Sequence, residues 1–125
     1  MAEENIANAK SEEVKPIIIR DQTNGDVFVL EFNRDTVKMA EQRGFKIGAI
    51  DAGVVVSTTE DLFHYAFKMH HPKMSKADTD KILYEKLHGM PEGMLLRLID
   101  LYVLPIEALK QKEEEAKNLT MTVEF

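Results

Sequence analysis

The sequence predicts an α+β fold, in which an N-terminal β-hairpin is followed by about four helices. Three observations predict this class: two β-branched and aromatic runs near the N-terminus, an Asn-Gly pair between them, and a later series of apolar positions at helical spacing. The 125 residues, 44% hydrophobic and 30% charged, suit one domain. We expect a disordered arm over residues 1–14, a single α+β domain over residues 15–111, and a charged linker with a strand-like C-terminal tail over residues 112–125.

The hairpin is expected from the runs at residues 16–20 and 26–32. Asn24 and Gly25 lie between these runs, and both residue types tolerate the positive φ that tight hairpin turns require. Because side chains alternate across a strand, one face of the second run is strongly apolar. The side chains on this face are Phe28, Leu30 and Phe32. A lone hairpin is marginal in water, so helices, a further strand or another subunit must cover this face.

Capping residues mark the expected helices after the hairpin. The first helix runs over residues 34–43, with Asn33 as its N-cap and Gly44 just past its end. Residues 45–56 are interpreted as a linker followed by a short buried segment.

Two further helices are expected from capping-box patterns. Thr58 with Asp61 predicts a helix that continues to about residue 70. Ser75 with Asp78 predicts the next helix, which carries apolar residues at helical spacing.

The last helix is expected to start with Pro91 at its first position, where the missing N–H costs nothing. Residues 94–103 are mostly apolar on all sides, so this segment is expected to be the main core helix. Pro105 should kink this helix or start a new turn.

The C-terminal segment, residues 119–125, alternates polar and apolar side chains after a charged linker. Such alternation is typical of a β-strand. Three outcomes are open: the strand joins the hairpin sheet of its own molecule, it adds to a sheet of a partner, or the end is disordered.

The sequence contains no arrangement of residues that predicts catalysis. It has no cysteine, which excludes thiol chemistry and Cys-based zinc sites, and it has no phosphate-binding or hydrolase motif. His64 and His71 are two helical turns apart, and His70 points away from His71, so a shared metal ion is not expected. His70 and His71 should instead lie at a helix C-terminus, where the helix dipole favours positive charge. We therefore expect no enzyme, no cofactor and no metal.

Charge and hydropathy narrow the class of partner. The formal net charge of -6 repels a phosphate backbone and argues against nucleic-acid binding. The start of the chain is polar and acidic, and no run is long and apolar enough to cross a membrane. A cytoplasmic protein that binds neither nucleic acid nor membranes is expected.

Seven methionines are present, and Met packs adaptably both in cores and on surfaces that bind varied apolar helices. Core packing is the favoured interpretation, and a Met-lined client surface is the alternative. The side chains expected to contact a partner are Met69, Met121, Val123 and Phe125, although the same residues can close the core of the monomer.

Several runs of the chain carry a resemblance to a known family. These runs are LEFNRDTV at residues 30–37, AEQRGF at 40–45, FHYAFKMHH at 63–71, LYVLP at 101–105 and MTVEF at 121–125. Together they resemble the phage tail assembly chaperone-like family, which comprises small tail proteins of Gram-positive phages and prophages. The resemblance covers about residues 27–125, and its motifs are structural rather than catalytic.

The resemblance implies a non-enzymatic role in the cytoplasm of the host cell. Chaperones of this kind coat the long helical tape-measure protein and keep it soluble until the tail tube protein polymerises around it. Self-association is also implied, because repetition along the client gives avidity to weak contacts.

Two other classes remain as alternatives. A small phage-encoded adaptor or regulatory protein would bind one host partner through a sheet edge, in a one-to-one complex. An enzyme or small-ligand protein would need a polar pocket, which nothing in the sequence predicts.

Overall fold

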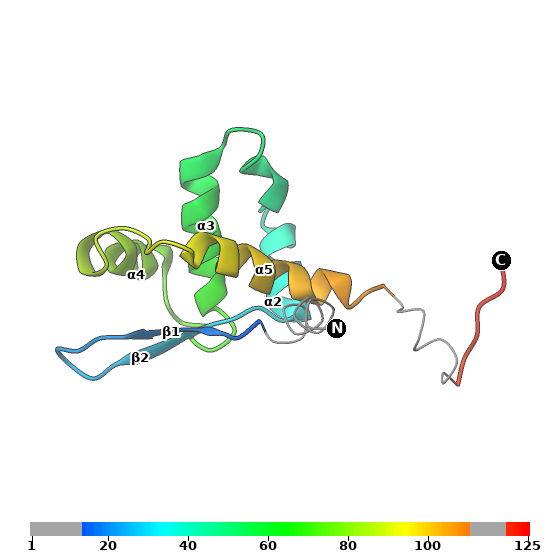
Figure 1. The fold of residues 1–125 in the computed structure, drawn as a ribbon, viewed down its shortest axis with the longest axis horizontal. Helices are drawn as coiled ribbons and strands as arrows, with labels where there is room; N and C mark the ends of the chain where they lie inside the picture. Colours follow the sequence, from blue (N-terminus) through cyan, green and yellow to red (C-terminus); the bar gives the residue numbers. More distant parts are fainter. Residues whose placement is uncertain (1–13, 111–119) are drawn as a thin grey trace, which may run out of the picture.

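The computed structural model describes residues 14–110 and 120–125. The predicted class is confirmed: a two-stranded antiparallel hairpin is followed by four helices, α2 to α5. The elements are β1 (Ile17–Arg20), β2 (Val27–Leu30), α2 (Arg34–Gln42), the 3-10 turn η1 (Ile47–Ala49), α3 (Val55–Phe67), α4 (Lys76–Lys81), the π-type turn η2 (Ile82–Lys86), and α5 (Met94–Glu107). The hairpin forms one side of the molecule and the helices pack on the other (Figure 1).

The hairpin forms where the sequence predicts it. Ile17 pairs with Leu30 and Arg20 with Val27, and the apolar face of β2 turns toward the helices. The connecting loop is wider than a two-residue turn, because the Asp21 N–H donates to the Asp26 carbonyl at 2.8 Å. Within this loop Gly25 takes the positive φ, at 81°.

The core lies between the hairpin, α3 and α5. Its fully buried members include Leu30 of β2, Phe63 and Phe67 of α3, and Leu98 of α5. The ring of Phe67 meets that of Phe28 edge to face, with centroids 5.9 Å apart. Helix α3 therefore holds the hairpin against α5.

The predicted caps of α2 and α4 are both present. The side chain of Asn33 accepts a hydrogen bond from the Thr36 N–H at 2.8 Å. Ser75 accepts from the Asp78 N–H at 3.1 Å, and the Asp78 carboxylate accepts from the Ser75 N–H. Each cap satisfies backbone donors that the first turn of a helix leaves unpaired.

The predicted start of α3 is wrong by one turn. The helix begins at Val55, and Thr58 is buried inside it instead of capping it. Thr58 is one turn before Leu62 and therefore lies on the core-facing side of the helix. Its side chain packs in the core and does not cap the helix. The short buried segment expected within residues 45–56 is also not found, because Val54, Val55 and Val56 are exposed.

The predicted start of α5 is also wrong. Gly93, with a φ of 84°, is the residue before the helix, and Pro91 lies in the preceding turn, where its carbonyl accepts from the Met94 N–H. Pro105 is inside α5, which continues to Glu107. The helix tolerates it near its end, where few intrahelical bonds remain to be lost.

The described part of the C-terminus, residues 120–125, is exposed and forms no strand. Within the described ranges the sheet has only β1 and β2, so these residues do not extend the sheet of their own molecule. The described residues do not include the predicted linker up to Leu119. Of the predicted arm they include only Val14. No helix in the described part of the chain is long and apolar enough to cross a membrane.

Candidate functional site

An open apolar groove crosses the start of α3 and the start of α5. We call it the α3–α5 groove, and its volume is about 480 Å³. Its apolar lining comprises Val55, Val56, Leu83, Tyr84, Met90, Pro91, Leu95 and Leu96. Apolar side chains from three separate elements thus converge on a surface that nothing in the described chain covers.

One wall of the groove is the first turn of α3. Val56 is 69% exposed, and Val54 and Val55 are also exposed. The N-cap position, Val54, supplies no side-chain hydrogen bond to this turn. Neither burial nor capping within the monomer accounts for three consecutive β-branched apolar residues here, so they are suited to contact a partner.

The opposite wall is the first turn of α5 and the loop before it. Leu96 is 69% exposed, whereas Leu98 on the other side of the same helix is fully buried. The loop bends sharply into the helix through Gly89 and Gly93, whose φ values are 108° and 84°. Residues with a Cβ rarely adopt these angles, so the glycines fix the shape of this wall.

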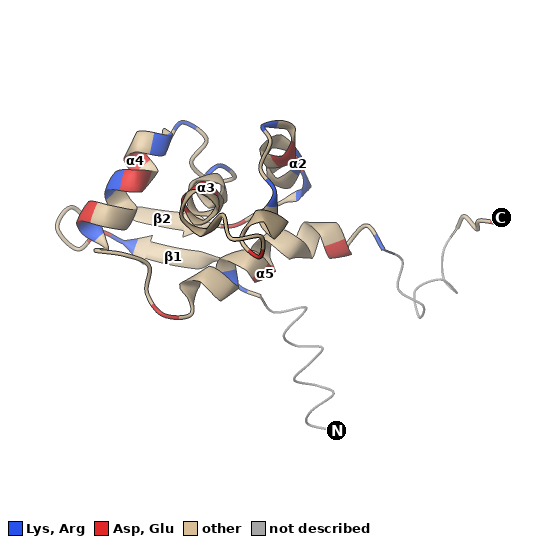
Figure 2. Cartoon of the chain, turned by 90° about the horizontal axis from the view of Figure 1, so that it is seen from above, with Lys and Arg blue, Asp and Glu red and all other residues tan. Residues whose placement is uncertain are grey.

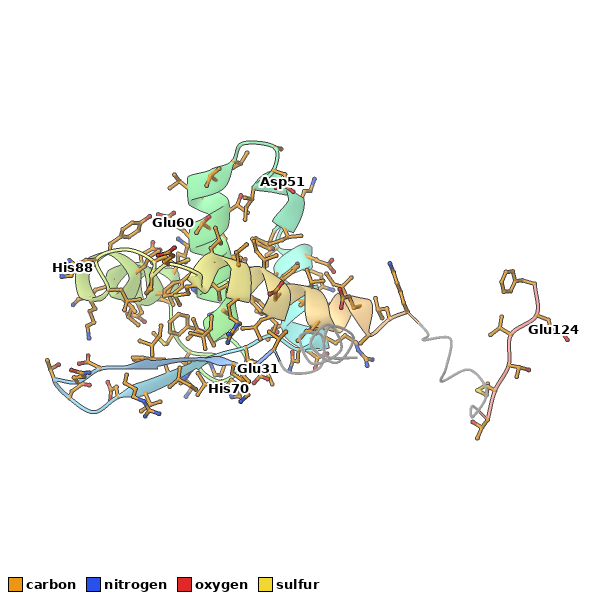
Figure 3. The ribbon with its side chains drawn as sticks, viewed as in Figure 1. Glu31, Asp51, Glu60, His70, His88 and Glu124 are labelled. Atoms are coloured by element: carbon orange, nitrogen blue, oxygen red, sulfur yellow. The ribbon has the colours of Figure 1, made fainter. Side chains whose placement is uncertain are left out.

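The polar groups of the groove are mainly acidic. Glu60 extends from α3 and accepts a hydrogen bond from the Tyr84 hydroxyl of η2, and Glu92 lies at the α5 end. Glu60 is labelled in Figure 3. The hydrogen bond to the Glu60 carboxylate raises the pKa of Tyr84 above its usual value. Helix α4 carries both basic and acidic side chains, whereas α5 is mainly uncharged (Figure 2).

Thr59 contributes a buried hydroxyl to the residues around the groove, and its Oγ1 has no hydrogen-bond partner among the described residues. An unpaired buried polar atom costs about 1–3 kcal/mol. We therefore expect Thr59→Val, which keeps the shape of the side chain, to raise the free energy of unfolding by about 1 kcal/mol in urea denaturation. Thr79→Val is the matched comparison and should lower stability, because the buried Thr79 hydroxyl donates to the Lys76 carbonyl and lies 3.0 Å from His64 Nδ1. A loss of stability in Thr59→Val would show that the hydroxyl is satisfied in solution.

The chemistry of the groove favours binding over catalysis. Its surface offers apolar contact area flanked by the carboxylates of Glu60 and Glu92. Within residues 14–110 and 120–125, no group of three or more His, Asp or Glu side chains is placed to hold a metal ion. The surface matches an apolar helix face whose flanking side chains are basic.

The four side chains predicted to contact a partner do not come together. Met69 is half-buried in the turn after α3, away from the groove. Met121 and Val123 are 82% and 81% exposed, and Phe125 is fully exposed. The structure thus places them on two separate surfaces and leaves their role as partner contacts a prediction.

The sequence suggested that His70 and His71 complement the dipole at the end of a helix. In the structure both side chains also contact the hairpin. His71 Nε2 accepts a hydrogen bond from the Val29 N–H at 3.0 Å. His70 Nε2 lies 2.8 Å from the Glu31 carboxylate, and the two side chains meet beside β2 (Figure 3). Burial lowers the pKa of His71, as expected for a ring nitrogen that accepts a hydrogen bond.

A comparison with family models places the whole chain in one family. The matching model is described as "Domain of unknown function (DUF5055)" and covers residues 1–125. The chain belongs to this family. Neither the curated proteins nor the solved structures with which this DUF5055 chain was compared include a match.

The sequence of this DUF5055 chain gave only a weak signal for the groove. The apolar run Val54-Val55-Val56 falls in the segment that was predicted to be buried. Leu96 belongs to a helix with apolar residues on nearly all sides. A helix whose apolar residues occupy more than one face has a second surface to cover. The apolar residues beyond those of one core-facing side were therefore the signal for the groove in the sequence.

Proposed function

We propose that this protein is a non-enzymatic phage tail assembly chaperone, which coats the tape-measure protein and keeps it soluble while the tail tube assembles. Two observations support the proposal. The runs at residues 30–45, 63–71, 101–105 and 121–125 resemble those of tail assembly chaperone-like proteins. The open α3–α5 groove supplies an apolar surface suited to a helical client.

The groove carries this proposal because its chemistry matches a long helical client. An amphipathic helix presents an apolar strip at positions i, i+3, i+4 and i+7, and such strips dock in apolar grooves between helices. Val56 and Leu96 would cover that strip from the two walls of the groove. Glu60 and Glu92 would meet basic side chains at the edges of the strip.

Many copies that each bind the client weakly suit this task better than one copy that binds tightly. Each subunit offers a groove of modest size, so its affinity for one helical segment is expected to be low. Repeated subunits along a long client would gain avidity and could leave one at a time when the tail tube protein arrives. The proposed partners are therefore the tape-measure protein, the tail tube protein and further copies of this chain.

Leu96→Asp tests the groove directly. Burial of a leucine side chain is worth about 1.5–3 kcal/mol, so a charge at this position should weaken client binding by about tenfold or more. The measurement is co-expression with a tape-measure protein from a phage or prophage that encodes a member of this family. The amount of tape-measure protein left in the supernatant after centrifugation should be high with the wild type and low with Leu96→Asp.

Leu109→Asp is the matched control, since Leu109 is 73% exposed and lies outside the groove. This variant should keep the client soluble as well as the wild type does. Equal rescue by both variants would exclude the groove as the client surface. A wild-type chain that leaves the client insoluble would contradict the chaperone proposal and favour an adaptor that binds a single host protein.

A further inference from the structure

The two-stranded sheet has one closed edge and one open edge. At the outer edge of β2, the Glu31 N–H donates to the Ala66 carbonyl at 2.9 Å, and the Val29 N–H donates to His71 Nε2 at 3.0 Å. The end of α3 therefore occupies this edge. The N–H groups of Val29 and Glu31 are therefore not available to another strand at this end of β2.

The outer edge of β1 is different. Because the Val29 N–H points away from β1, Ile18 and Val29 form a non-hydrogen-bonded pair, and the main-chain groups of Ile18 also point outward. The same holds two residues later for Arg20. Within the described ranges, no hydrogen bond satisfies the main-chain N–H or C=O groups of Ile18 and Arg20.

Space for a further strand lies beside this open edge. A groove of about 610 Å³ runs along β1 and is bounded on its far side by the segment from Leu87 to Arg97. Ile17 and Ile19 face the helices and pack against the core, whereas Ile18 and Arg20 are exposed. A strand added here would have Ile17 and Ile19 beside it on the core side, and the exposed Ile18 and Arg20 beside it on the outer side.

The C-terminal segment, residues 120–125, has the matching pattern. Met121, Val123 and Phe125 alternate with Thr120, Thr122 and Glu124. With the apolar set turned toward the helices beside Ile17 and Ile19, Glu124 would lie on the outer face, where Arg20 offers the opposite charge. All six residues are exposed in the monomer, so they are available for pairing.

We propose that the open edge of β1 binds residues 120–125 of a second copy of this chain, which adds a third strand to the sheet. In the single chain the edge and the tail stay apart. Within the described ranges the sheet contains only β1 and β2, and all of residues 120–125 are exposed. Helix α5 begins beside the β1 groove, at Met94, and its 14 residues span about 20 Å. The end of α5 lies on the opposite side of the molecule from the hairpin turn (Figure 1).

A head-to-tail contact of this kind can link many copies in series. Each copy offers one edge and one tail, and the two surfaces are different, so the contact is heterologous and can continue from copy to copy. Such a chain would supply the repeated subunits that a coat on a long client needs. The β1 groove and the α3–α5 groove share Pro91, Glu92 and Gly93, whereas Val56 and Leu96 line only the α3–α5 groove and the β1 strand lines only the other. Variants at Leu96 and in the tail therefore test client binding and the strand contact separately.

Cysteine pairs can test the contact, because the natural chain contains no cysteine. One variant carries Ile18→Cys and a second carries Thr122→Cys, both on the outer face of the proposed strand pair. Oxidation of an equimolar mixture should give a disulfide-linked dimer of the two variants on a non-reducing gel. The control is a mixture of Lys38→Cys, which is on α2, with Thr122→Cys. This mixture should give several-fold less of the disulfide-linked dimer.

A chain that carries both Ile18→Cys and Thr122→Cys distinguishes the source of the tail. Oxidation should give a ladder of linked copies. A cross-linked monomer would show that the tail folds back on its own sheet and would overturn the proposal of a second copy, and absence of any cross-link would overturn the strand contact itself.

Val123→Pro is the complementary variant. With Thr122 beside Ile18 and Glu124 beside Arg20, the added strand runs parallel to β1, and in a parallel ladder the Val123 N–H donates to the Ile18 carbonyl. Proline removes this N–H. Self-association measured by light scattering over a range of concentrations should weaken by about tenfold or more. Thermal unfolding of the dilute monomer should be unchanged, since Val123 makes no contact in the monomer. Leu96→Asp should self-associate normally, so that failure of the groove and failure of the strand contact are separable. Unchanged self-association in Val123→Pro would overturn the proposal.

Discussion

Phe67→Ala is expected to lower the free energy of unfolding by about 3–5 kcal/mol. Phe67 is fully buried and is the side chain through which α3 meets the hairpin, with ring centroids 5.0 Å from Phe63 and 5.9 Å from Phe28. Its removal leaves a cavity between the two layers, and the surrounding elements can collapse only in part. Urea denaturation followed by circular dichroism measures the change.

Leu96→Ala is the comparison for Phe67→Ala, because Leu96 is also a helical residue. Leu96 is 69% exposed, so its truncation should change stability by no more than about 0.5 kcal/mol. This small effect would also show that Leu96 is not needed for folding, as expected for a residue that serves a partner. A cost below about 1 kcal/mol for Phe67→Ala would mean that α3 does not hold the hairpin in solution.

Acidification from pH 7 to pH 4 is expected to destabilise the protein by about 3 kcal/mol through His64 alone. His64 is buried in α3, and its Nδ1 lies 3.0 Å from the Thr79 hydroxyl of α4. The Thr79 hydroxyl donates to the Lys76 carbonyl, so His64 donates to Thr79 through Nδ1–H. The lowered pKa of His64 keeps the ring neutral near pH 7.

The causes of the His64 shift all act in the folded state. Burial is the main cause, and together with the nearby cations of Lys68, Lys76 and Arg43 it lowers the pKa of His64 from 6.5 to about 4, against an opposing effect of Asp80. Above pH 6.5 neither the folded nor the unfolded chain is protonated at this residue, and the stabilisation is fully present. Between pH 6.5 and 4 only the unfolded chain binds the proton, so stability falls with pH until the folded chain is protonated as well.

His64→Gln isolates this contribution, since glutamine can still donate to Thr79 but does not titrate near neutrality. The difference in unfolding free energy between wild type and variant should shrink as the pH falls from 6.5 to 4. The Asp21 and Asp78 carboxyls, whose pKa values are lowered by hydrogen bonds, lose stabilisation only at lower pH. Burial lowers the pKa of His71 and raises that of Asp61, so both groups change stability in the same window, but they are present in both proteins and cancel in the difference. A direct NMR titration of His64 with a midpoint near 6.5 would contradict the burial argument.

Local signals in the sequence were sufficient for the class of the fold and for several of its elements. Asn33 and Ser75 cap helices where they were expected to, because a cap depends on a side chain and a backbone N–H only a few residues away. The apolar face of β2 was also predictable, since strand alternation assigns Leu30 and Phe32 to the same side.

The tertiary structure alone decided where α3 and α5 begin and which apolar residues stay exposed. Periodicity shows which side chains are apolar but not whether another element reaches far enough to cover them, so Val56 and Leu96 could not be told from core residues. The closure of the β2 edge by His71 depends on a residue 42 positions away along the chain, and no local pattern encodes such a contact. The groove and the open strand edge are products of packing between distant segments, whereas the hairpin and the helix caps are properties of neighbouring residues.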